Sequence, residues 1–127
     1  MLDSGALVGF VGVSDLDRAQ VFYGEQLGLT LSDERPFALV AEVAGTMLRI
    51  TAVEDVAPVP YTVLGWRVPN LDSAIDGLVA RGVTFTRYDG MEQDVRGAWT
   101  APGGSRIAWF LDPDGNNLSL TEFADTI

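Results

Sequence analysis

The sequence predicts an α+β fold made of two tandem βαβββ modules. Three observations support this prediction. The chain has 127 residues, 47% of them hydrophobic, which fits one domain with a real core. The segment "VGFVGVSDLDRAQVFYGEQLGL" (8–29) recurs as "VLGWRVPNLDSAIDGLVARGV" (63–83), and "TMLRIT" (46–51) recurs as "NNLSLT" (116–121). Because each copy joins strand patterns to a single helical pattern, we expect two similar halves in one domain, residues 1–127.

The first module is expected over about residues 5–52. An apolar run at 7–13 predicts a strand, and "SDLDRAQVFYGEQLG" (14–28) predicts a helix. Ser14 or Asp15 can cap the start of this helix, because both side chains accept hydrogen bonds from its first free N–H groups. The turn signals "DERP" and "AGT" then separate three expected strands, near 29–33, 36–43 and 46–52.

A linker is expected at residues 52–61, where "AVEDVAPVPY" holds two prolines and two acids with little periodicity. The second module follows over about residues 62–123. Its helix is predicted from a stripe of apolar residues at helical spacing, namely Leu71, Ala74, Ile75, Leu78 and Val79. Its last three strands are expected near 83–88, 105–111 and 117–123.

Several kinds of chemistry are excluded by missing residue types. The chain has no cysteine and no histidine, and all eight basic residues are arginines. Disulfides, thiolate and imidazole metal sites, Ser-His and Cys-His catalysis, and lysine Schiff bases are therefore impossible. Any acid–base chemistry must use Asp, Glu, Tyr or a bound water.

The net charge of −10 argues against a nucleic-acid partner, because phosphate backbones would be repelled. The same charge either provides solubility or attracts a cationic small molecule or partner. No apolar run approaches the ~20 residues that span a bilayer, and no signal peptide pattern is present. We therefore expect a cytoplasmic protein with no membrane partner.

Two motifs carry a resemblance to a known family. "V-S-D-L-D-R-A-x-x-F-Y-x-x-x-L-G-L" at Val13–Leu29 and "F-L-D-P-D-G-N" at Phe110–Asn116 resemble the vicinal oxygen chelate superfamily. That superfamily includes glyoxalase I, extradiol dioxygenases, and fosfomycin and bleomycin resistance proteins. The resemblance covers nearly the whole chain. It implies βαβββ modules whose strands form a cupped mixed sheet, usually in a homodimer with swapped or side-by-side modules, and it implies no single activity.

Metal enzymes of this superfamily carry ligands at four equivalent strand positions. Alignment of the motifs places these positions at Val8, Arg49, Val63 and Ser119. None of these side chains is a first-rate ligand for a divalent cation, and an arginine repels one. The resemblance, adjusted for these residues, implies a cup with no metal and no cofactor.

The acidic stretch "DPDGNN" does not fit a calcium loop either. Counted from Asp112, loop position six is Asn117 where an EF-hand needs Gly, and position twelve is Phe123 where it needs Glu. Pro113 and Gly115 suit a hairpin turn instead.

Strand alternation sorts the residues that would line the cup. If Val8 faces the cup, Phe10 does too, while Val11 and Val13 face the helix. Further residues are placed inward by alternation or by alignment to the superfamily: Gly12, Met47, Arg49, Thr51, Gly65, Arg67, Ile107, Trp109, Asn117, Ser119 and Thr121. The cup is thus expected to be apolar and aromatic, with two arginines.

Arg49 and Arg67 allow two interpretations. They clamp a carboxylate, phosphate or enolate oxygen of a ligand, or they form internal ion pairs, for which Glu42 and Glu122 are the candidate partners. Arginines inside a cavity act on a ligand more strongly than distant surface charges, which salt screens. The two arginines therefore favour a ligand with an anionic group, although the net charge of the chain is negative.

Trp99 lies in the Gly/Pro-rich segment "RGAWTAPGGSR", which is expected to be a loop over the mouth of the cup. It either stacks on a planar ligand or packs on a dimer partner. Trp109 either contacts a ligand or belongs to the core. Tyr61 and Tyr88 are possible proton donors that the sequence does not place.

The favoured hypothesis is a metal-independent binding protein that holds a planar or aromatic small molecule. Its predicted ligand-binding residues are Phe10, Arg49, Arg67, Trp99, Trp109 and Ser119. The alternative is a metal-independent isomerase or lyase in which an arginine stabilises an oxyanion, although no base is evident. A third reading is a scaffold whose cup is filled by its own side chains.

Overall fold

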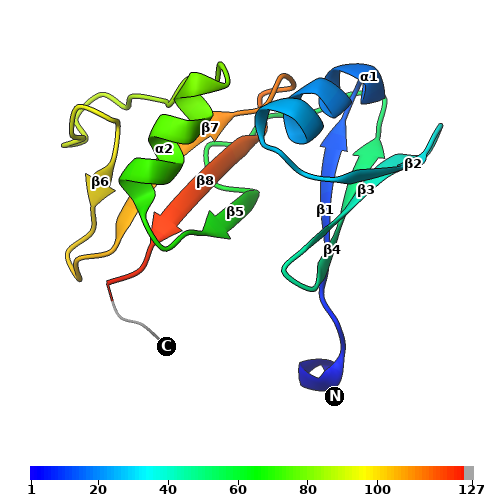
Figure 1. The fold of residues 1–127 in the computed structure, drawn as a ribbon, viewed down its shortest axis with the longest axis horizontal. Helices are drawn as coiled ribbons and strands as arrows, with labels where there is room; N and C mark the ends of the chain where they lie inside the picture. The colour runs from blue at the N-terminus through cyan, green and yellow to red at the C-terminus, as the bar shows by residue number, and fades with distance from the viewer. Residues whose placement is uncertain (125–127) are drawn as a thin grey trace. The chain divides into compact units, whose positions relative to one another are not determined.

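The computed structural model describes residues 1–124 and has two compact units, Met1–Pro58 and Val59–Ile127. Each unit holds one four-stranded mixed sheet and one main helical segment (Figure 1). The predicted α+β fold of two βαβββ modules is confirmed, because both units run strand, helix and then three strands.

The first unit opens with a 3₁₀ turn, η1 (Leu2–Ser4), and strand β1 (Val8–Val13). The chain then forms α1 (Leu16–Ala19), which continues as the π-helical segment η2 (Gln20–Gln26). Three strands follow: β2 (Leu31–Glu34), β3 (Ala38–Val43) and β4 (Thr46–Ala52). The sheet order is β1-β4-β3-β2, with β1 parallel to β4 and the other pairs antiparallel.

One face of the first sheet forms the core of its unit. Cross-strand partners Val11, Ile50 and Leu39 are all nearly inaccessible, as are Phe22 and Tyr23 of the helical segment. Of the two predicted caps for this segment, Asp15 is the N-cap, and its carboxylate accepts the Arg18 N–H at 3.1 Å.

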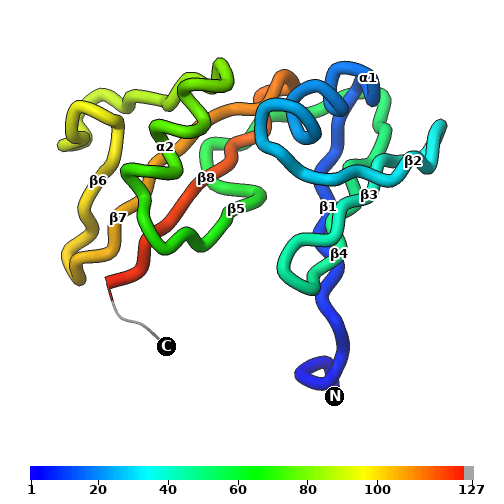
Figure 2. The backbone as a smooth tube through the Cα atoms, in the orientation of Figure 1, coloured from blue at the N-terminus to red at the C-terminus, as the bar shows by residue number. Residues whose placement is uncertain are grey.

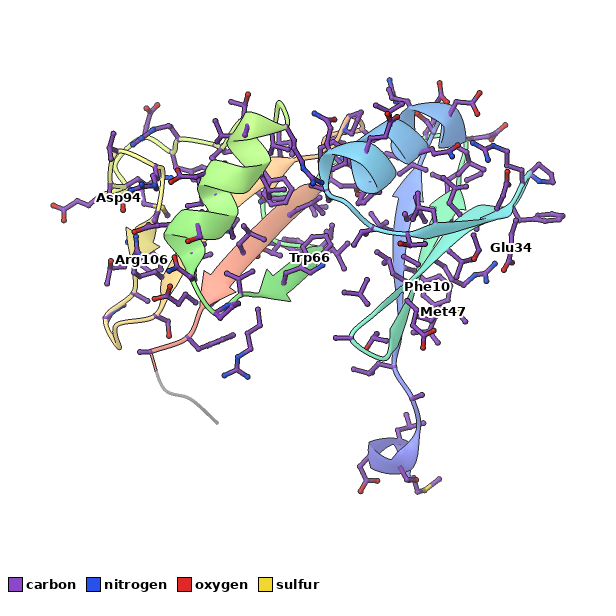
Figure 3. All side chains as sticks on the ribbon, in the orientation of Figure 1. Phe10, Glu34, Met47, Trp66, Asp94 and Arg106 are labelled. Carbon is purple, nitrogen blue, oxygen red and sulfur yellow. The ribbon has the colours of Figure 1, made fainter. Side chains whose placement is uncertain are left out.

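The opposite face of the first sheet has the alternation that the sequence predicts. Val8, Phe10 and Met47 point to this face and are 44%, 64% and 42% exposed. Figure 3 shows Phe10 and Met47 on the strands of this sheet, and β1 and β4 pair so that Phe10 lies opposite Arg49.

The second unit contains β5 (Leu64–Arg67), α2 (Leu71–Ala80), β6 (Trp99–Thr100), β7 (Arg106–Leu111) and β8 (Asn117–Glu122). Its sheet order is β5-β8-β7-β6, again with one parallel pair, β5 and β8. Its core includes Leu71 and Ile75 of α2, together with Phe110 and Leu118 from the sheet.

Helix α2 has two acceptors at its first turn. The Asn70 side chain accepts the Ser73 N–H at 3.0 Å, and the Glu122 carboxylate accepts the Leu71 N–H at 2.8 Å. These bonds satisfy N–H groups that have no partner inside the helix. Glu122, proposed as an arginine partner, therefore caps a helix.

One strand prediction is wrong. Residues 83–88 form a single bridge, between Phe85 and Phe110, instead of a strand, and the edge strand is β6 at Trp99–Thr100. Figure 2 shows the long loop between α2 and β6. The physical cause is Gln93, whose side chain bonds the Tyr88 N–H at 2.8 Å and the Thr86 carbonyl at 2.9 Å. The Gln93 side chain thus forms hydrogen bonds with backbone groups that, in a strand, would bond to the neighbouring strand.

Among the described residues, no helix has the length and apolar character needed to cross a membrane.

Candidate functional site

An open pocket of ≈ 860 Å³ lies within the second unit. Its walls come from the segment before β5, the loop after Phe85, and strands β6, β7 and β8. The lining residues are Pro60, Tyr61, Thr62, Tyr88, Asp89, Gly90, Met91, Glu92, Trp99, Trp109 and Asn117. Apolar rings and a few polar groups are thus gathered at one concave place, as in small-molecule sites generally.

Three aromatic rings form one wall of the pocket. The Trp99 and Trp109 ring centroids are 6.2 Å apart with 38° between the ring planes, and Tyr88 meets Trp109 edge to face at 5.6 Å. The Trp109 indole Nε1–H donates to Thr62 Oγ1 at 3.2 Å, which fixes the orientation of that ring. This wall is a surface on which a flat ring can stack.

Strand pairing explains why the two tryptophans meet. Trp99 pairs with Ile107, two residues from Trp109 on the same strand, so both indoles stand on one face of the sheet. Trp99 was expected in a loop over the cup mouth, and this expectation is wrong because it is the first residue of β6. Both indoles are partly exposed.

The loop that supplies Tyr88, Asp89 and Glu92 is held by its own hydrogen bonds. Beside its two bonds to Tyr88 and Thr86, Gln93 donates to the Gly97 carbonyl at 2.8 Å. Gly97 has a φ of 94°, a backbone conformation that favours glycine, and this lets the chain turn into β6. The loop is therefore shaped before any ligand arrives.

Asn117 is the buried polar residue of the pocket. It is 4% exposed, and its Nδ2 donates to the Tyr88 hydroxyl at 3.4 Å. Its Oδ1 is buried and has no hydrogen-bond partner among the described residues. An unpaired buried carbonyl oxygen carries a free-energy cost of about 1–3 kcal/mol.

The charged side chains of the lining are both acidic. Asp89 and Glu92 contribute carboxylates, and no arginine is among the lining residues that the structure describes. Arg87, in the same loop, directs its Nη2 to the Val95 carbonyl at 2.6 Å. The pocket therefore has negative character.

The two arginines predicted to bind ligand lie elsewhere. Arg49 Nη2 is 3.3 Å from Glu34 Oε1, so its partner is neither Glu42 nor Glu122. Arg67 is exposed, and its Cζ lies 4.9 Å from the centroid of the Phe123 ring. Arg49 belongs to the first unit, and Arg67 does not line the pocket of the second.

The remaining predicted site residues are also outside this pocket. Phe10 lies on the open face of the first sheet. Ser119 is 5% exposed and pairs with Gly65 on one side and Trp109 on the other. A Cβ added at Gly65 would lie 2.9 Å from Ser119 Oγ. The Ser119 side chain therefore has no free space on the side of Gly65.

The four positions of the superfamily's metal ligands do not fit a divalent cation. Val8 and Val63 have no donor atom, Arg49 is positively charged and faces Glu34, and Ser119 offers one buried hydroxyl. Within residues 1–124 no three His, Cys, Asp or Glu side chains form a group that could hold a metal.

The acids of "DPDGNN" stabilise a turn. Asp112 Oδ1 accepts the N–H groups of Asp114 and Asn116, each at 2.9 Å, and its Oδ2 accepts the Asn116 side-chain amide at 2.8 Å. Gly115 has a φ of 86°. The carboxylate is thus directed at the turn's own donors, as the hairpin interpretation predicts.

An ion-pair cluster connects α2, the loop and β7 behind the pocket. Arg106 Nη2 lies 2.7 Å from Asp72 Oδ1 and 3.1 Å from Asp94 Oδ2; Figure 3 labels Asp94 and Arg106. Burial alone would raise the pKa of Asp94, but the N–H groups of Ala98 and Arg96 and the Arg106 guanidinium together lower it. The Asp94 carboxylate thus holds the backbone at Ala98, the residue before Trp99.

The fold agrees with comparisons to known proteins. A family model described as "Glyoxalase/Bleomycin resistance protein/Dioxygenase superfamily" matches residues 7–120, and the chain belongs to this superfamily. The family resemblance read from the sequence is thereby confirmed. A comparison with curated protein sequences finds no match.

Solved structures of the same superfamily share the fold. A member from Sphaerobacter thermophilus is 25% identical with a TM-score of 0.72, over 97% of this chain and 100% of that chain. TnmS3, an antibiotic binding protein from Streptomyces sp. CB03234, is 29% identical with a TM-score of 0.70, over 96% and 98%. The fosfomycin resistance protein FosX from Listeria monocytogenes is 17% identical with a TM-score of 0.72, over 95% and 94%, and shares the fold alone.

Proposed function

We propose that this protein is a metal-independent small-molecule binding protein that holds a planar or aromatic ligand in the pocket of its second unit. The observation that carries the proposal is the wall of Trp99, Trp109 and Tyr88 rings around a concave space with a buried amide. Flat rings gain most from stacking on such a wall, and each aromatic pair adds about 0.5–1.5 kcal/mol beyond the area that it buries. The 29% identity to an antibiotic binding protein supports the same class of function.

The enzyme alternative requires an arginine beside a reacting oxygen. Arg49 is engaged by Glu34, and Arg67 lies over Phe123, so neither provides that group at the pocket. Tyr88, Asp89 and Glu92 could exchange a proton there, but no arginine among the described lining residues could stabilise an oxyanion. Binding without turnover is therefore the function we favour.

Binding is tested by titrating the protein with three-ring planar dyes while following heat release and tryptophan fluorescence. We expect Trp99→Leu to weaken binding about 3–10-fold, since one stacking surface is lost. Trp66→Leu is the matched control, because Trp66 stacks on Phe110 in the second unit and is not among the pocket residues. No heat and no fluorescence change with any planar probe would overturn the proposal.

Metal independence has its own test. We expect dialysis against EDTA to leave both the dye affinity and the melting temperature unchanged, because the four ligand positions lack donors for a divalent cation. Elemental analysis of the purified protein should find no stoichiometric metal. Binding that appears only after Zn²⁺, Mn²⁺ or Ni²⁺ is added would contradict this part of the proposal.

The homodimer that the resemblance implies and a cytoplasmic location are also proposed. Sedimentation equilibrium at micromolar protein should then give twice the chain mass of 13.6 kDa. A single species at the chain mass would rule out the dimer under those conditions.

A further inference from the structure

We infer that the pocket selects one class of planar ligand: aromatic cations that carry an N–H donor. This inference rests on the proposed function and narrows it. Three features of the pocket support it: the acidic lining, the indole faces and the buried oxygen of Asn117.

The lining favours a positive ligand in two independent ways. Asp89 and Glu92 are its charged residues, and the nearby Arg87 guanidinium donates to backbone carbonyls in its own loop. The faces of Trp99 and Trp109 carry the negative side of the ring quadrupole, which attracts a cation by about 0.5–1 kcal/mol at exposed sites. Carboxylates and rings therefore act in the same direction.

The inferred ligand is thus positively charged, whereas the expectation from the sequence was a ligand with an anionic group bound by Arg49 and Arg67. That expectation required Arg49 or Arg67 in the cavity. Both lie elsewhere, whereas Asp89 and Glu92 line it. The net charge of −10 adds a field of the same sign, which raises the local concentration of cations at low salt.

Asn117 supplies the hydrogen-bond part of the inference. Its Oδ1 is buried without a donor, and its Nδ2 bond to Tyr88 is long at 3.4 Å. The torsion that orients an Asn amide is soft, so the group can rotate its oxygen toward the pocket at little cost. An N–H at the edge of a stacked ring could then donate to this oxygen, and a ligand without such a donor could not.

Three probes of similar size separate these requirements. Thionine is a planar three-ring cation with amino N–H donors. Methylene blue is the same ring system with each amino group fully methylated, so it keeps the charge and loses those donors. Anthraquinone-2-sulfonate is a planar three-ring anion. Affinities are measured by calorimetry at fixed ionic strength with the full chain.

We expect thionine to bind at least about tenfold more tightly than the sulfonate, and more tightly than methylene blue. The double variant D89N/E92Q should weaken thionine about tenfold and leave the sulfonate unchanged or tighter. The matched control is E54Q/D55N in the linker, which removes the same charge from exposed residues outside the pocket and should change neither affinity.

Asn117→Leu tests the donor requirement, because Leu is close in shape to Asn but has no oxygen. This variant should bind thionine only as tightly as it binds methylene blue. Circular dichroism and the melting temperature confirm that it is folded. Asn117→Asp is a second variant that keeps an acceptor, and it should keep the preference for thionine.

Two kinds of failure are distinguishable. If none of the three probes binds, the proposed function itself fails. If the sulfonate binds as tightly as thionine, or if D89N/E92Q leaves their ratio unchanged, the charge inference fails while the binding function stands. Equal affinities for thionine and methylene blue in the unmodified protein would overturn the role of Asn117.

Discussion

At the scale of single residues, Gly65 and Ser119 show how tightly the sheet beside the pocket is packed. The two residues are partners across β5 and β8, and a Cβ at position 65 would lie 2.9 Å from Ser119 Oγ. We expect Gly65→Ala to lower the free energy of unfolding by about 1–3 kcal/mol, because the extra methyl overpacks the contact. Urea denaturation measures this difference.

The double variant G65A/S119A identifies the cause. Removing the Ser119 hydroxyl leaves room for the new methyl group, so the alanine at 65 should cost less in this background than in the natural chain. An equal cost in both backgrounds would mean that the backbone at Gly65, and not the contact with Ser119, sets the requirement for glycine.

The residues of the site could be predicted only in part. Alignment to the superfamily places Trp109 inward, and Trp99 is a candidate because of its ring, although the sequence does not predict its strand. Asp89 and Glu92 were missed because they belong to a loop, and alternation orders only the residues of strands. Tyr88 was noted as a phenol but could not be placed. The one available signal was the cluster "YDGMEQD" (88–94), which joins an aromatic ring to three acids.

At the scale of elements, the loop between α2 and β6 depends on one side chain. Gln93 makes three bonds of 2.8–2.9 Å to the backbone of Thr86, Tyr88 and Gly97. We expect Gln93→Ala to destabilise the protein by about 1–3 kcal/mol, because three partly buried backbone groups lose their partners. The Tyr88 N–H should exchange with solvent faster, and dye affinity should fall since Tyr88 and Glu92 move with the loop.

Gln93→Glu discriminates between its donor and acceptor roles. A carboxylate can still accept the Tyr88 N–H but cannot donate to the Thr86 and Gly97 carbonyls. We expect this variant to lose most of the stability that Gln93→Ala loses. Val95→Ala is the control, because Val95 lies in the same loop and is 87% exposed. A Glu variant as stable as the natural chain would show that the acceptor alone organises the loop.

This loop also explains which elements the sequence predicts well. The strands at 7–13, 46–52 and 105–111 lie within one or two residues of β1, β4 and β7, because their alternation and their pairing agree. Residues 83–88 have the same alternating pattern but pair only at Phe85. An alternating pattern indicates only that a segment tends to be extended. It does not indicate that the side chain of Gln93, five residues after Tyr88, forms hydrogen bonds with the backbone of this segment.

The ion pairs behind the pocket predict a pH dependence. The pKa of Asp94 is lower in the folded state than its ordinary value of 3.8. The stability that Asp94 contributes is therefore present above about pH 4 and is lost as the pH falls through the lower, folded value. Asp94 is 43% exposed, so this contribution is about 0.2–1 kcal/mol.

Asp94→Asn should accordingly melt about 1–4 °C below the natural chain at pH 7. The two melting temperatures should converge as the pH falls below about 4, because acid neutralises Asp94 in the natural chain as well. Asp55→Asn is the control, since Asp55 is an exposed linker residue with no ion-pair partner among residues 1–124 that the structure records. A gap that stays constant down to acid pH would contradict the role of the charge.

At the scale of the whole molecule, both units contain a sheet, a helix and buried apolar side chains, but the described pocket belongs to the second alone. The sequence repeat predicts two modules of the same fold, because the repeated residues are those that form the strands and helices. It does not predict which module holds the pocket, because Tyr88, Asp89 and Glu92 occur in an insertion-like loop without a counterpart in the first module. The proposed function therefore rests on residues that the two repeats do not share.

This asymmetry makes a final prediction about insertions. The segment around Ala57 and Pro58 is exposed and free of regular structure, and every pocket residue follows it in the chain, from Pro60 onward. A protease recognition sequence inserted between Ala57 and Pro58 should be tolerated, and cleavage there should change the dye affinity less than about twofold. The same sequence inserted between Gly90 and Met91 also enters an exposed loop, but it displaces residues of the pocket. That variant should fold and lose binding, as judged by circular dichroism and calorimetry. If the insertion at 57 abolishes binding in a folded protein, residues of the first unit must contribute to the site; if the insertion at 90 leaves binding intact, the ligand occupies another place.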